Sequence, residues 1–231
     1  HTRSYLWAHD ELERPDRMLV TVYPANDLQD AIRMYEQFDA QTAVKTNADR
    51  IQSAYRLSGM TMHSVLLRSG SGVERCLRFA LGFEYGQMTP IPKADVALID
   101  LVGHFKEALV MLDKVGISKS LLPAPYMAAA ITAIQRDGEQ VLPFLTAIKE
   151  NLGINQGGEQ DAIHTVTSYL RSKDYSDLKS KQGAGNAKMA VPAAIFLHAY
   201  SAWEADPDSA WFRTYPKRTK ILTSFFGKSS N

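Results

Sequence analysis

The sequence predicts a mainly α-helical protein with a small α/β piece at its N-terminal end. From about residue 46 onward, apolar residues recur at helical spacing, and glycines and prolines separate these segments. The most convincing strand, residues 18–23, lies near the start of the chain. Hydrophobic residues make up 45% of the 231 residues and charged residues 22%, so extensive disorder is excluded. The single cysteine, Cys76, excludes an internal disulfide and a cysteine-based zinc site.

The N-terminal piece, residues 1–45, has the predicted order helix, strand, helix. Its first helix runs from Thr2 to about Leu12 and is broken near Pro15, because proline disfavours helix in the residue before it. The strand follows, and ends at Pro24. Asn26-Asp27 then provides an N-cap for a second helix. The apolar face of that helix consists of Leu28, Ala31, Ile32, Tyr35 and Phe38.

Residues 46–90 form a helical segment that contains a candidate helix-turn-helix. Thr46 or Asn47 caps a helix that ends at Ser58-Gly59. Two further helices are predicted over residues 61–68 and 71–81, and Ser69-Gly70 forms the turn between them. Ser71 and Glu74 have the spacing of a capping box at the start of the second one.

Residues 91–231 are predicted to form a helical domain, separated from the preceding segment by Pro90 and Pro92. It begins with a long amphipathic pattern over residues 96–112. Further helices are predicted at 125–136, 139–151, 158–172 and 188–205, and the most loop-like stretch is 182–186.

The N-terminal piece resembles the second half of the ParB/sulfiredoxin-like domain. In that family a strand ends in Gly-x-x-Arg just before a helix; here His1-Thr2-Arg3 fills the x-x-Arg positions, and Ala8 stands where the family helix has alanine. Residues 18–23 match the next strand of the family, and residues 27–37 match its acidic helix. We therefore expect the glycine and the first strands of such a domain to precede His1.

This resemblance implies binding of nucleotide or nucleic-acid phosphate at His1, Thr2 and Arg3. An arginine in the first turn of a helix lies beside free backbone N–H groups, and its planar guanidinium matches two phosphate oxygens. The alternative is a surface arginine paired with Asp10 or Glu11.

A helix-turn-helix follows the N-terminal domain in ParB-like proteins, so residues 61–81 are a candidate DNA-reading unit. We expect Val73, Leu77 and Phe79 to face the core. Arginine serves both phosphate positioning and bidentate contact with guanine. The expected DNA contacts are the exposed residues Arg68, Ser71, Arg75 and Arg78. The alternative is a plain helical hairpin.

The basic C-terminus is a candidate auxiliary DNA contact. Its cations Arg213, Lys217, Arg218 and Lys220 alternate with aromatic residues, and bases can stack on rings while lysines follow the phosphates. The alternative is that these aromatic residues pack a terminal helix onto the body. Residues 41–90 carry six basic and three acidic side chains, and residues 171–231 carry ten and five. Two such zones suit localised anionic partners, although charge swings of this size also arise by chance.

The sequence predicts no metal site. His104, His164 and His198 stand alone on predicted helices, and the stretch from Gly183 to Lys188 lacks the ending of a phosphate-binding loop. A cofactor is implied only by the resemblance, as a nucleoside triphosphate with Mg²⁺ at the Arg3 site. Sulfiredoxin chemistry is excluded, because His1 occupies the position of the catalytic cysteine in that enzyme.

Three hypotheses follow. The leading one is a ParB-like DNA-binding protein from a bacterium or bacteriophage, acting in the cytoplasm of the bacterial cell. The second is a nucleotide hydrolase or nuclease on the same scaffold, which the lack of an acidic metal-binding pair argues against. The third is a non-enzymatic docking subunit of a larger phage or bacterial assembly, such as a polymerase complex, or a homodimer. The net charge of +1 favours this third hypothesis. No apolar run reaches the ~20 residues that span a bilayer, so no membrane association is expected.

Overall fold

We describe the protein from a computed structural model, in which the chain divides into two units, His1–Val44 and Lys45–Asn231. The structure describes residues 46–70, 72–153, 160–181 and 185–207 of the second unit. In the first unit it describes His9, Glu13, Arg17, residues 22–27, Asp30, Ala31 and Met34.

The first unit confirms one predicted helix start. The Asp27 side chain accepts a hydrogen bond from the backbone N–H of Asp30 at 2.8 Å, as expected of an N-cap. The first predicted helix lies outside the described residues except for His9, and the strand lies outside them except for Val22 and Tyr23, which are exposed.

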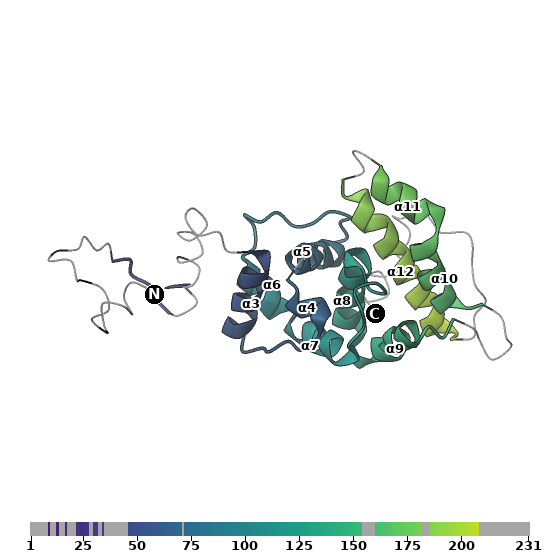
Figure 1. Cartoon of the computed structure of the whole chain (residues 1–231), viewed down its shortest axis with the longest axis horizontal. Helices are drawn as coiled ribbons and strands as arrows, with labels where there is room; N and C mark the ends of the chain where they lie inside the picture. Colours follow the sequence, from purple (N-terminus) through teal and green to yellow (C-terminus); the bar gives the residue numbers. More distant parts are fainter. Residues whose placement is uncertain are drawn as a thin grey trace. The chain divides into compact units, whose positions relative to one another are not determined.

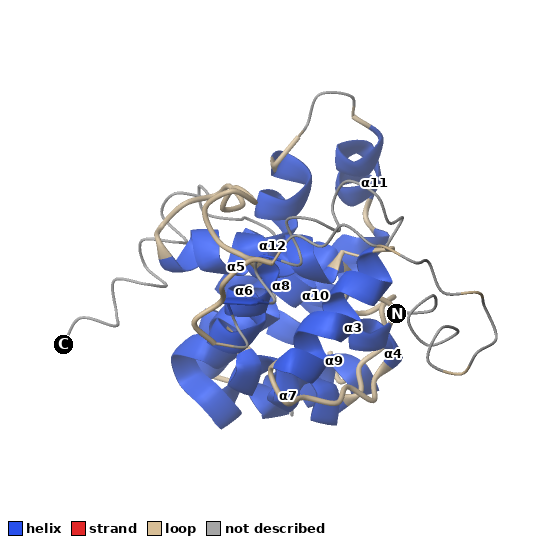
Figure 2. Ribbon diagram, turned by 90° about the vertical axis from the view of Figure 1, so that its left-hand side faces the viewer, coloured by secondary structure: helices blue, strands red, loops and turns tan. Residues whose placement is uncertain are grey.

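The described residues of the second unit consist mainly of helices and the loops that join them, which confirms the predicted helical body (Figures 1 and 2). In chain order they are α3 (Asn47–Leu57), α4 (Val65–Arg68), α5 (Val73–Glu84), α6 (Leu98–His104), α7 (Lys106–Val115), α8 (Ala124–Asp137), the 3₁₀ helix η1 (Gly138–Val141), α9 (Leu142–Glu150), α10 (Ala162–Arg171), α11 (Lys173–Ser180) and α12 (Ala187–Ala205).

Helix α8 lies at the centre of this unit, between α5 and α12 (Figure 1). Its side chains from Pro125 to Ile134 are all buried, and its alanines let the neighbouring helices approach closely. Aromatic rings fill the space beside it: Phe144 lies 5.4 Å from both Phe196 and Tyr200, measured between ring centroids. One core therefore includes residues from both predicted segments, 46–90 and 91–231, which form one unit rather than two.

Two predicted helices of residues 91–231 differ in detail from the structure, and one helix was not predicted. The pattern over residues 96–112 is two helices, α6 and α7, because the backbone leaves the helical conformation at Phe105 (φ −96°, ψ 18°), whose side chain is buried. The segment 139–151 begins with η1 before α9. Helix α11 was not predicted, because its eight residues are mostly polar and include only two large apolar side chains, Tyr175 and Leu178.

Lysine side chains close several helix ends. Lys106 donates from Nζ to the carbonyl of Ser58 after α3 at 2.9 Å, and Lys149 donates to Val115 at the end of α7 at 2.7 Å. Lys188 does the same for Lys179 near the end of α11, at 2.8 Å. Each contact satisfies a carbonyl that has no intrahelical partner and places a positive charge at the negative end of the helix dipole.

Candidate anion-binding site

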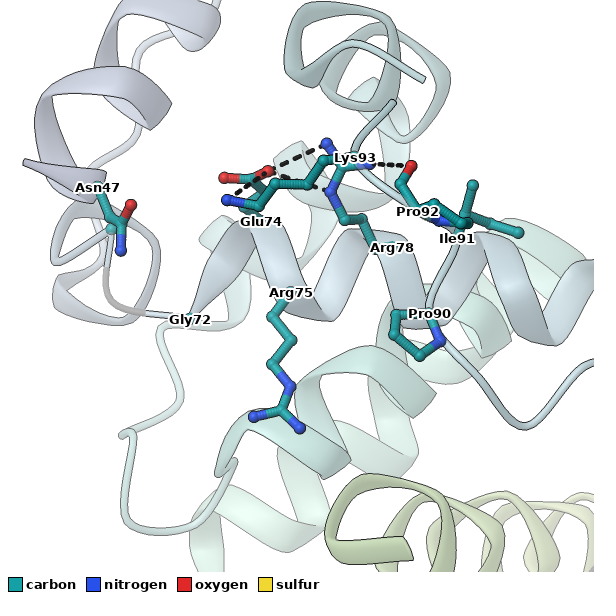
Figure 3. A pocket seen from close by; sticks show the side chains of 10 residues that line it. Asn47, Gly72, Glu74, Arg75, Arg78, Pro90, Ile91, Pro92 and Lys93 are labelled. Atoms are coloured by element: carbon teal, nitrogen blue, oxygen red, sulfur yellow. Dashed lines mark hydrogen bonds and ion pairs between the residues drawn. The ribbon is translucent and has the colours of Figure 1, made fainter. Parts of the chain in front are cut away.

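Cationic side chains gather around a hollow at the N-terminal end of α5. The hollow has a volume of about 470 Å³, and its walls come from the start of α3, the turn before α5 and the loop after α5 (Figure 3). It is lined by Asn47, Gly70, Gly72, Glu74, Arg75, Arg78, Pro90, Ile91, Pro92 and Lys93.

The wall formed by residues 90–93 depends on a loop that turns back along α5. The backbone N–H of Gln87 donates to the carbonyl of Gly82 at 2.8 Å, and that of Ile91 donates to the carbonyl of Arg78 at 3.1 Å. Thr89 passes so close to α5 that a Cβ on Gly82 would lie 2.1 Å from its carbonyl oxygen. Glycine at position 82 is therefore what allows the loop to lie against the helix.

The opposite wall depends on a second close approach. Gly70 has φ +62°, and a Cβ there would lie 2.4 Å from the Cα of Ala48 in α3. Gly72, at φ +87°, is the N-cap of α5. Both residues adopt the left-handed conformation that other residues rarely tolerate, and the resulting turn brings Asn47 to the edge of the hollow.

The prediction that Arg78 is exposed for DNA contact is wrong. The residue is only 5% exposed, because it lies on the side of α5 that the returning loop covers. Its Nη1 donates to the carbonyls of Pro92 and Val96 at 3.0 and 3.1 Å. Its Nε donates to Glu74 at 3.1 Å. The Arg78 guanidinium therefore fixes the loop onto the helix and is not available to base edges.

The predicted helix-turn-helix also differs from the structure. Its first helix is reduced from residues 61–68 to Val65–Arg68, and nine of the twelve residues of α5 are buried. A recognition helix needs an exposed face that can enter the major groove, which α5 lacks along most of its length. Arg68 is exposed at the end of α4 but does not line the hollow, and Ser71 lies outside the described residues.

Glu74 is the centre of the charge network in the hollow. Its carboxylate pairs with Arg78 at 3.0 Å, Arg50 at 3.5 Å and Lys93 at 3.7 Å, and Figure 3 shows Arg78 and Lys93 converging on it. The predicted capping box with Ser71 is wrong, because the N-cap of α5 is Gly72, which makes no side-chain cap. One carboxylate thus faces three cations.

Arg75 adds a fourth cation, on the other side of α5. Its side chain points away from Glu74 in Figure 3, and its Cζ lies 5.7 Å from the centroid of the Phe79 ring. Among the described residues no carboxylate pairs with the exposed Arg75 guanidinium. Together with the positive end of the helix dipole, this excess of cations suits an anion, and arginine in particular matches the geometry of a phosphate.

Cys76, next to Arg75, is not a nucleophile. Burial raises the pKa of its thiol to about 12, although the nearby charges of Arg75 and Lys119 act in the opposite direction. Its Sγ lies 3.2 Å from the carbonyl oxygen of Ala124, to which it donates. A thiol held in this way is protonated at neutral pH and unreactive.

The remaining predicted site residues lie outside the described part of the chain. They are His1, Thr2, Arg3, Arg213, Lys217, Arg218 and Lys220.

His104 pairs with Glu84 at 2.8 Å. In the described ranges no three or more His, Cys, Asp or Glu side chains are grouped so that they could hold a metal, and no helix there is long and apolar enough to cross a membrane.

The chain matches no protein-family model, no curated protein and no solved structure. The resemblance to ParB-like domains therefore stays a prediction, and the geometry of the hollow is the basis for a functional proposal.

The sequence indicated Arg75 as a binding residue but gave no sign of Arg50 or Lys93. The one signal for the returning loop was Gly82, an isolated glycine within an apolar helix, which can indicate close approach of another segment.

Proposed function

We propose that this protein binds nucleic acid and holds a backbone phosphate in the hollow at the N-terminal end of α5. The observation that supports this proposal is the excess of cations there. Arg50, Arg78 and Lys93 pair with the single carboxylate of Glu74, and Arg75 adds a further cation to the lining of the hollow. Phosphate contacts of this kind supply affinity and orientation and carry no sequence information by themselves.

The cations have different roles in this proposal. Lys93 and Arg75 are exposed and line the hollow, so they would contact the nucleic-acid backbone directly. Arg78 would act as a positioning residue, because it holds the 90–93 wall through the carbonyl of Pro92. Further contacts along the nucleic acid remain proposed for the other residues that the sequence indicated. They are His1, Thr2, Arg3, Arg68, Ser71, Arg213, Lys217, Arg218 and Lys220.

The test is a fluorescence-anisotropy titration of the full chain with random duplex DNA at 50 and 200 mM salt, roughly the range over which phosphate contacts weaken strongly. The variant is Arg75→Gln with Lys93→Gln. A matched control, Arg56→Gln with Lys114→Gln, removes the same charge at exposed positions that do not line the hollow. We expect the first variant to bind about tenfold or more weakly, with a salt slope shallower by about 2, and the control to bind within about threefold of wild type.

Equal losses in the two variants would show that binding depends on overall charge and not on the hollow. An absence of binding at 50 mM salt would reject the proposal. That result would favour the docking subunit of a larger phage or bacterial assembly, for which the net charge of +1 is the supporting observation.

A further inference from the structure

We propose that Glu74 regulates the hollow as an internal counter-anion, and that a nucleic-acid phosphate binds by replacing its carboxylate at Arg50 and Lys93. This inference rests on the proposed function. It assigns to Glu74 the opposite effect from its neighbours: the cations favour binding, whereas Glu74 opposes it.

The three ion pairs of Glu74 are unequal. Arg78 is held closely, at 3.0 Å, and is buried with further bonds to two carbonyls. Arg50 and Lys93 lie 3.5 and 3.7 Å from the carboxylate, beyond the 2.7–2.9 Å of a charge-assisted hydrogen bond. Their side chains are 35% and 67% exposed. Exposed pairs of this kind contribute little to stability, so these two cations can leave Glu74 at small cost.

The exchange leaves no buried charge without a partner. The Glu74 side chain is 13% exposed, and an isolated carboxylate in such a place would be costly. After Arg50 and Lys93 turn to a phosphate, Glu74 still accepts a hydrogen bond from Nε of Arg78 and keeps its ion pair with Nη2. Arg78 is therefore the permanent partner of Glu74, and the other two are shared with the ligand.

The Glu74 carboxylate repels any anion that enters the hollow. Its negative charge lies among the cations that an incoming anion would use, so every anion that enters must overcome its repulsion. A phosphate with two oxygens in reach of Arg50 and Lys93 gains more than a monodentate anion such as chloride. Glu74 thus lowers the affinity for every anion, and the contact of two phosphate oxygens with Arg50 and Lys93 is what offsets this repulsion.

The test compares Glu74→Gln with wild type in the same duplex-DNA titration at 50 mM salt. Glutamine keeps an oxygen that can accept from Arg78 and removes the charge. We expect binding to become about three- to tenfold tighter, the effect of removing one nearby negative charge at a solvent-screened site. The matched control is Glu107→Gln, which makes the same charge change at an exposed position of α7 outside the hollow; its affinity should stay within about twofold of wild type.

The outcomes separate this inference from the proposed function. If wild type binds in a salt-dependent way and Glu74→Gln, shown to be folded by circular dichroism, binds no more tightly, the role of Glu74 is overturned. The proposed function is then left intact. Binding by neither protein overturns both. Binding by Glu74→Gln alone supports the inference. Should Glu74→Gln not fold, Arg50→Gln replaces it in the test, since this variant leaves the Glu74–Arg78 pair in place. We expect Arg50→Gln to bind duplex DNA several-fold more weakly than wild type. An unchanged affinity overturns the proposal that a phosphate takes the place of Glu74 at Arg50.

Discussion

The carboxylate of Asp113 accepts a hydrogen bond from the backbone N–H of Ser64 at 2.7 Å, although 49 residues separate the two along the chain. The same carboxylate accepts the N–H of His63 at 2.9 Å. Ser64 is the N-cap of the four-residue helix α4. A side chain of α7 thus determines where α4 begins. In the structure α4 begins at Val65, four residues after the start predicted from the sequence.

This contact predicts a pH-dependent contribution to stability. Partial burial acts to raise the pKa of Asp113, but hydrogen bonds from Ser64 and His63 outweigh it, and the pKa lies below the ordinary value. A carboxyl with a lower pKa in the folded state stabilises the protein above its unfolded pKa, and this stabilisation is lost as the pH falls through the folded pKa.

Asp113→Asn should therefore lower the free energy of unfolding at pH 7 by about 1 kcal/mol, a value reduced by solvent screening. The difference from wild type should shrink as the pH falls below about 4, the ordinary pKa of an aspartate in the unfolded chain, and through the lower pKa of Asp113 in the folded protein. Urea unfolding of both proteins at pH 7, 4 and 3 measures this. A difference that stays constant over that range would contradict the prediction.

A methyl group at position 82 should disrupt the loop that forms one wall of the hollow. The Cβ of Gly82→Ala would overlap the carbonyl of Thr89, so the loop or the helix must move, at a cost of about 3 kcal/mol. The control is Gly103→Ala in α6, where a Cβ meets nothing within 4 Å. That variant should be more stable by about 0.5–1 kcal/mol because alanine has the higher helix propensity. Similar stabilities of the two variants in chemical denaturation would argue against the close approach.

Replacing Arg78 should test whether it is a structural residue. Arg78→Met leaves the carboxylate of Glu74 without its closest partner and two carbonyls without their donor, and we expect a loss of about 3 kcal/mol. Arg75→Met, one turn away on the exposed side, should change stability by less than about 0.5 kcal/mol. Thermal or urea unfolding distinguishes them. If Arg78→Met were as stable as Arg75→Met, the buried network described above would be incorrect.

The Cys76 thiol should be unreactive in the folded protein. Because burial raises its pKa to about 12, the thiolate that reacts with disulfide reagents is nearly absent at pH 8. Ellman's reagent should release no colour from the native protein over minutes, and one equivalent in guanidinium chloride, since the chain has one cysteine. Rapid reaction without denaturant would mean that the α5–α8 interface opens.

Much of the helical body could be predicted because its signals are local. Thr46 caps α3 through a capping box with Asp49, and both partners lie within one turn. Helices α8 and α12 are 14 and 19 residues long and rich in apolar residues, which is long enough to identify each helix without knowing its neighbours. The site could be predicted less well. The sequence indicated Arg75 and Arg78 and placed both on an exposed face, which is correct for Arg75 and wrong for Arg78.

The sequence by itself determined most of the segments that become helices and where several of them are capped, because caps and periodicity depend on residues within a few positions of one another. Only the tertiary structure decided which faces those helices bury. Arg78 is buried because the loop after α5 returns over it, and α4 is short because Asp113 holds Ser64. Both outcomes depend on segments distant in sequence, whose approach is set by close packing that no local pattern records.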